Sequence, residues 1–139
     1  MIRVFLDIQS EKYSPNEISE LIGCSPDDFH CIGDITKSSL LNNQSDKDRP
    51  VNRYKFHSWK IKPASDIDSY FIEDFIESIL CKIRPYKKEI MNLDLELNKK
   101  IFVWLTIDIN DSTPGCLLSP EIMNELSSLG ISIEIDISV

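Results

Sequence analysis

Aliphatic residues recur at every second position in three segments of the chain, and a period of two is typical of half-buried β-strands. Residues 2–9 and 101–109 show this alternation, as does the C-terminal series Ile131, Ile133, Ile135 and Ile137. Residues 29–35 and 51–62 are also strand-like. The second of these changes its hydrophobic face near His57 and Ser58, which predicts a bulge there. The pattern therefore predicts five strands.

Two strand–helix units, residues 2–23 and 101–130, echo each other. Val4–Gln9 and Val103–Asp108 share the order valine, aromatic, leucine, polar, isoleucine, polar. Each is followed by a polar loop and then by a stretch that begins with Ser-Pro, and these two stretches also resemble each other. Internal duplication, convergence on one design and chance similarity all remain open as explanations of the echo.

Serine and proline at the start of these two stretches predict helices. Ser14 and Ser119 are good N-caps, and the proline that follows each suits the first helical turn, where no amide donor is needed. Glu17 completes a capping box with Ser14. The stretches close on Gly23 and Gly130, which suit the left-handed residue at a helix end.

The remaining segments complete a single α+β domain over residues 1–139. A helix is predicted over residues 66–84, and Pro85 kinks or restarts it before residues 86–93. Residues 38–50 are polar and predict an exposed loop. The order β-α-β-β-α-β-α-β predicts a ferredoxin-like sandwich, with an approximately five-stranded, largely antiparallel sheet and helices packed on one face.

Several short motifs run through the chain in a recognisable order. They are Ser14-Pro15, Glu17-Ile18, Leu21, Gly23, Pro26 and Gly33, then Trp59, and finally Leu118-Ser119-Pro120-Glu121, Leu126, Leu129-Gly130, Ile133 and Ile135-Asp136-Ile137. In these motifs the chain resembles the bacterial family catalogued as domain of unknown function 4279, over nearly its whole length. The resemblance implies a fold and no catalytic residue.

Charge narrows the class of partner. The chain has 15 basic and 23 acidic residues and a net charge of −8, so a phosphate backbone or an anionic membrane surface is a disfavoured partner. A basic protein would be attracted instead. No apolar run is long enough to span a bilayer, and Asp7 interrupts the start too early for a signal peptide, which predicts a cytoplasmic protein.

The usual signatures of chemistry are missing from the sequence. Four glycines form neither a phosphate-binding loop nor a dinucleotide fingerprint, and four cysteines with two histidines lack the spacing of a metal site. We therefore predict no catalytic residue, no metal and no cofactor, which favours a non-enzymatic role.

One face of the predicted sheet carries aromatic and acidic side chains opposite the aliphatic ones. Its candidate partner-binding residues are Phe5, Asp7, Phe102, Trp104, Asp108, Glu134 and Asp136. The rings are typical anchors for a protein partner, and the acids would steer a basic one. The alternative is structural: residues 36–50 or a homodimer cover the rings, and the acids are merely solvated.

The leading hypothesis is therefore a non-enzymatic protein-binding domain, in concrete form an immunity-type or antitoxin-like protein that masks a basic toxin. The alternative is a small-molecule-binding domain or an unrecognised enzyme, with a pocket near His57 and Trp59. Residues 47–62 are locally basic, which indicates either a site for an anion or acidic partner or the protection of an exposed sheet edge by lysines.

Overall fold

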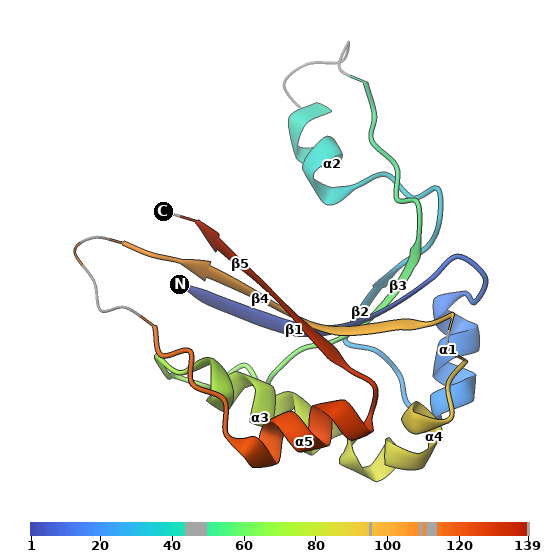
Figure 1. The fold of residues 1–139 in the computed structure, drawn as a ribbon. Coiled ribbons are helices and arrows are strands. Elements are labelled where there is room, and N and C mark those ends of the chain that lie inside the picture. The colour runs from blue at the N-terminus through green and yellow to red at the C-terminus, as the bar shows by residue number, and fades with distance from the viewer. Residues whose placement is uncertain (44–49, 95, 109, 111–113, 139) are drawn as a thin grey trace.

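A single five-stranded sheet organises the molecule (Figure 1). The computed structural model describes residues 1–43, 50–94, 96–108, 110 and 114–138. Within them the sheet order is β2-β3-β1-β4-β5, antiparallel at every step except the parallel pair β4 and β5. The strands are β1 (Ile2–Ser10), β2 (Asp28–His30), β3 (His57–Ile61), β4 (Asn98–Thr106) and β5 (Ser132–Ser138). The α+β prediction is confirmed, whereas the narrower ferredoxin-like assignment stays a prediction.

Four of the five α-helices cover one face of this sheet (Figure 1). They are α1 (Pro15–Ile22), α3 (Ile72–Ile83), α4 (Lys87–Met91) and α5 (Pro120–Ser128), and the short 3-10 turn η1 (Arg84–Tyr86) joins α3 to α4 at Pro85. The fifth, α2 (Lys37–Asn43), projects from the other side. No helix in the described ranges is long and apolar enough to cross a membrane.

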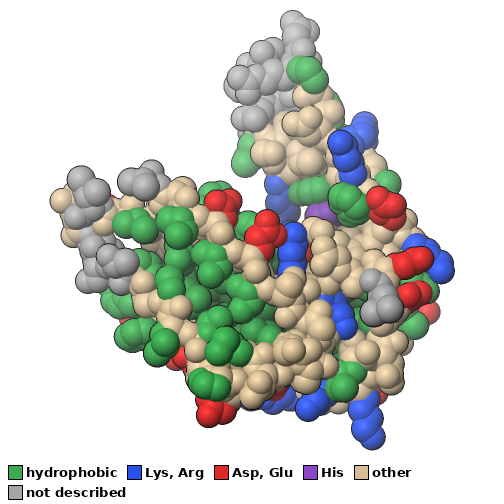
Figure 2. All heavy atoms as spheres, in the orientation of Figure 1, with side chains coloured by type: hydrophobic (Ala, Val, Ile, Leu, Met, Phe, Trp, Pro, Cys, Tyr) green, Lys and Arg blue, Asp and Glu red, His purple; other side chains and the backbone are tan. Residues whose placement is uncertain are grey.

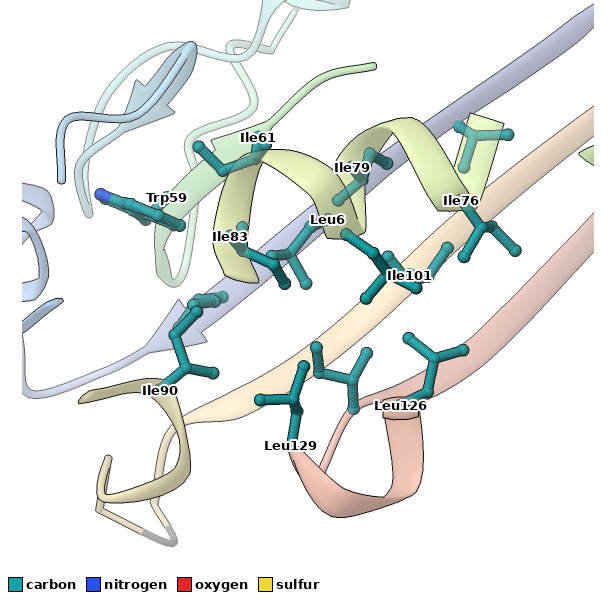
Figure 3. Close-up of a cluster of buried hydrophobic side chains, with 14 of the residues drawn as sticks. Leu6, Trp59, Ile61, Ile76, Ile79, Ile83, Ile90, Ile101, Leu126 and Leu129 are labelled. Carbon is teal, nitrogen blue, oxygen red and sulfur yellow. The ribbon is translucent and has the colours of Figure 1, made fainter. Parts of the chain in front are cut away.

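The hydrophobic core lies between the sheet and these four helices (Figure 3). Val4, Leu6 and Ile8 alternate along β1 toward the helices and are all buried. From the other side, α3 contributes Ile76 and Ile79 at helical spacing, both fully buried. Each large aliphatic side chain removed from water in this way contributes about 1.5–3 kcal/mol to folding.

The helix boundaries predicted from serine and glycine are confirmed. The Ser14 hydroxyl accepts a hydrogen bond from the Glu17 amide at 3.2 Å, and the Glu17 carboxylate accepts one from the Ser14 amide at 3.4 Å. Ser119 accepts one bond, from the Ile122 amide, at 3.3 Å. Gly23 has φ of 86° at the end of α1, a left-handed conformation that favours glycine.

The segment between β2 and β3 differs from the sequence prediction. The expected loop over residues 38–50 contains α2, whose first turn is held by the Thr36 hydroxyl, which accepts a hydrogen bond from the Ser39 amide at 3.2 Å. Residues 44–49 lie outside the described part of the chain. Leu40 and Leu41 on α2 are exposed, so the part of α2 whose burial is described has no apolar buried stripe of the kind from which sequence periodicity predicts a helix.

The strands flanking this segment are shorter than predicted. β2 covers residues 28–30 and β3 residues 57–61, and a lone bridge between Ile35 and Arg53 connects the chain beyond them. β3 lies between β2 and β1, so it is not a sheet edge. Edge protection is therefore the wrong interpretation for Lys60, the lysine within β3, whereas for the rest of residues 47–62 both interpretations stay predictions.

Candidate functional site: the open face of the sheet

The sheet face opposite the four covering helices is the candidate site, and we call it the open face. Strand register defines it, because directly paired residues of neighbouring strands point to the same side. Its central rows pair Phe5 with Phe102 and Arg3 with Trp104. Its members are Asp28 and His30 on β2, Ser58 and Lys60 on β3, Arg3, Phe5, Asp7 and Gln9 on β1, Asn98, Lys100, Phe102, Trp104 and Thr106 on β4, and Ser132, Glu134, Asp136 and Ser138 on β5.

Three aromatic rings form the middle of the open face. Phe5 and Phe102 stack with their centroids 5.3 Å apart, and the Lys60 ammonium lies 4.9 Å from the Phe5 ring centre. The Arg3 guanidinium lies 5.4 Å from the Trp104 ring centre. Trp104 is 38% exposed, so a large apolar ring stays accessible on this face. Each cation and its ring attract each other, which restrains the position of both side chains.

Positive side chains balance the acidic ones on the open face. Across the strands the row reads Asp28, Lys60, Asp7 and Lys100. The Lys100 ammonium continues it with an ion pair to Glu134 at 2.7 Å. The expected aromatic–acidic surface is thus a mixed one, whose exposed carboxylates, Glu134 and Asp136, lie on the outer strand β5.

Lys37 ties the start of α2 to the edge of the open face. Its ammonium lies 3.0 Å from the Asp28 carboxylate, and Lys62 approaches the same group at 3.8 Å. Burial alone would raise the pKa of Asp28, but the hydrogen bond and charge of Lys37 outweigh it and hold that pKa below its usual value. The lowered pKa of Asp28 favours its charged form, which is the form that pairs with Lys37.

Asp7 is a structural residue rather than a contact residue. Only 5% of it is exposed, and its two carboxylate oxygens accept hydrogen bonds from the Ser58 hydroxyl and from the Gln9 side-chain amide. Asp108 follows the end of β4 and is exposed there, outside the sheet pairing. Of the seven predicted contact residues, the structure brings five together on the accessible part of the open face: Phe5, Phe102, Trp104, Glu134 and Asp136.

His57 and Trp59, the residues of the alternative pocket, both have defined partners in the structure. Trp59 is fully buried on the helix side and donates a hydrogen bond from Nε1 to the Ser19 hydroxyl at 3.0 Å. The His57 Nδ1 accepts one from the Ile32 amide at 3.1 Å. Neither side chain lines any of the four best-defined grooves in the described residues, so the pocket near them stays a prediction.

A groove of about 710 Å³ opens beside the first half of β1, and Lys37 of α2 and Phe75 of α3 are among its lining residues. β3 ends at Ile61 while β1 continues to Ile2, so residues 62–67 replace a strand as the neighbour of the first half of β1. Arg3, Phe5, Lys60 and Trp104 are among its lining residues. Sequence reasoning missed the groove because the early end of β3 depends on strand register, which alternation alone does not reveal.

The groups that could bind a metal ion, and the cysteines, are spread over the described residues. Among the described residues, no three His, Cys, Asp or Glu side chains cluster closely enough to hold a metal ion. All four cysteines are free: Cys81 lies on α3, whereas Cys24, Cys31 and Cys116 lie in loops.

The family model described as a domain of unknown function (DUF4279) matches residues 1–139. The chain belongs to this family. No curated protein and no solved structure matches it. The family match confirms the resemblance seen in the Ser-Pro helix starts and the closing isoleucine strand. The family description assigns no function to the DUF4279 domain.

The burial of Asp7 predicts the effect of removing its hydroxyl partner. Ser58→Ala should lower the free energy of unfolding by about 2 kcal/mol, because a buried carboxylate oxygen loses its donor. Chemical denaturation of the purified variant measures this, with Ser65→Ala, at an exposed position, as the matched control. A loss within about 0.5 kcal/mol of the control would show that water reaches the carboxylate and that Asp7 is available for contact.

Proposed function

We propose that the chain is a non-enzymatic binding domain that uses its open face to bind another protein. The observation that supports this most is the accessible ring of Trp104 beside the stacked Phe5 and Phe102, on a face that α1, α3, α4 and α5 leave uncovered. Large aromatic side chains surrounded by polar groups are typical anchors of protein interfaces.

Charge favours a basic partner. The net charge of −8 attracts a basic protein over a distance, and the accessible carboxylates Glu134 and Asp136 lie beside the aromatic rings. At the centre of the face, Arg3 and Lys60 lie on rings, so a partner would meet the rings and the outer acids together. In its concrete form the proposal is an immunity-type or antitoxin-like domain that masks a basic toxin.

The groove favours a second candidate, the binding of a small planar anion. Its volume is within the range of small-molecule sites. Asp28 engages Lys37 and Lys62, whereas Arg3 and Lys60 form no ion pair with any described carboxylate and face the groove beside aromatic rings. An aromatic carboxylate or phosphate would place its ring on Phe5 or Trp104 and its charge against these cations.

Photocrosslinking from the open face tests the first proposal. We expect p-benzoylphenylalanine in place of Trp104 to trap one discrete protein in cells of the native host, and we expect that protein to be basic. The matched control carries the same group in place of Glu89, an exposed residue of α4 on the helix side. Gel electrophoresis and mass spectrometry identify the adducts.

Two outcomes would contradict that proposal. One is the absence of any protein adduct at position 104 under conditions in which the group crosslinks to an added test protein. The other is the same set of adducts from positions 104 and 89, which would indicate random collision.

Thermal denaturation tests the second candidate. A panel of planar aromatic carboxylates and phosphates should contain members that raise the melting temperature by about 5 °C or more near saturation. Arg3→Gln combined with Lys60→Gln should abolish the rise, whereas Lys88→Gln on α4 should not. A panel without effect, or a rise that survives the double substitution, would exclude this groove as an anion site.

A further inference from the structure

β5 is an edge strand whose outer side has no strand partner in the described part of the chain. The Ser138 carbonyl accepts a hydrogen bond from the Ile107 amide at 2.9 Å, so the main-chain groups of Ser138 point toward β4. Because these groups alternate along a strand, the N–H and C=O groups of Ile133, Ile135 and Ile137 point to the open edge.

Glu134 and Asp136 are charges of the kind that limit pairing at an exposed edge, but in the described residues β5 has few other protective features. β5 contains seven residues, none of which is proline or lysine, and it runs without a bulge in register with β4. A strand of this kind is a template for another extended chain.

The helix side of β5 is apolar and exposed. Ile135 and Ile137 are 46% and 57% exposed although they share a face with the buried core. Leu117, before α5, and Met123 on α5 are also exposed hydrophobic residues. Figure 2 shows hydrophobic side chains gathered into a broad patch on the side of the molecule where β5 and α5 lie. A patch of this kind marks an interaction site.

The other side of β5 is acidic, because Glu134 and Asp136 alternate with the isoleucines. A partner strand would therefore meet two different surfaces at once. Its residues on the helix side would cover Ile135 and Ile137, and its residues on the open face would lie opposite two carboxylates.

Like charges disfavour a second copy of the chain as the occupant. Two-fold antiparallel pairing of β5 with itself centres on one residue. Three registers pair five or more residues of this strand and keep the isoleucines of both copies on one side of the sheet. They centre on Glu134, Ile135 and Asp136. They place Glu134 opposite Glu134, Glu134 opposite Asp136, and Asp136 opposite Asp136, respectively, and like charges directly opposite each other destabilise a sheet.

We propose that β5 is the site where a partner protein adds a strand, and that the added segment alternates basic and apolar residues. This proposal rests on the proposed function in one respect, namely that the natural partner is a protein. Main-chain hydrogen bonds to Ile133, Ile135 and Ile137 would supply affinity, and the two side-chain rows would select the segment.

A synthetic peptide provides a direct test. The probe is a blocked seven-residue peptide that alternates lysine and valine, and its composition control has the four lysines in one block. We expect the alternating peptide to bind measurably and to slow hydrogen exchange of the Ile135 amide. The amides of Glu134 and Asp136 point toward β4, so they should be protected before the peptide is added.

Charge reversal on the edge should weaken this binding. Glu134→Lys combined with Asp136→Lys is expected to raise the dissociation constant about tenfold or more. The matched control, Glu20→Lys with Glu89→Lys, makes the same change in net charge at exposed positions of α1 and α4 and should have little effect. NMR spectra of both variants verify that the fold is retained.

Other results would overturn the proposal: no binding, equal binding of the blocked-charge peptide, or binding without protection of the Ile135 amide. A concentration-dependent dimer that protects Ile135 in the absence of peptide would identify a second copy as the occupant instead. If the peptide does not bind but photocrosslinking from position 104 traps a specific protein, strand addition at β5 is refuted and the proposed function is not.

Discussion

The fold depends on the burial of one face of the sheet against four helices. Leu6 and Ile8 on β1 and Trp59 on β3 are fully buried on that face, and α1 and α3 are held by packing against it. Because β1 is the middle strand, its side chains point alternately into the hydrophobic core and onto the open face. The free energy gained by burial on the helix side therefore determines which side chains are presented on the other.

The open face is stabilised by neighbouring side chains rather than by a covering layer. Phe5 stacks on Phe102, Arg3 and Lys60 lie over rings, and Asp7 is satisfied by Ser58 and Gln9. Such contacts keep the rings in place but leave part of Trp104 accessible. The result is a preformed surface, which lowers the entropic cost of binding a partner.

Period-two patterns and helix caps in the sequence predicted the strands, α1 and α5, because local geometry decides them. The open face followed from the same alternation, including Phe102, Trp104 and Asp136. The burial of Asp7 could not be predicted, since it depends on Ser58 arriving from a strand 51 residues away. The groove beside Arg3 and the exposure of Ile137 depend likewise on where neighbouring strands and helices stop. Interaction with a basic protein stays a prediction.

The two tryptophans test the one-sided burial most directly, since they lie on opposite faces of the sheet. Acrylamide is neutral, so the Arg3 charge over Trp104 does not bias its approach. In the Trp104→Phe variant, the fluorescence of the remaining Trp59 should be shielded from acrylamide quenching until the protein unfolds. In the Trp59→Phe variant, whose folding circular dichroism checks, Trp104 should be quenched several times more strongly than Trp59 is in the first variant. Equal quenching of the two in folded protein would contradict a sheet with one covered and one open face.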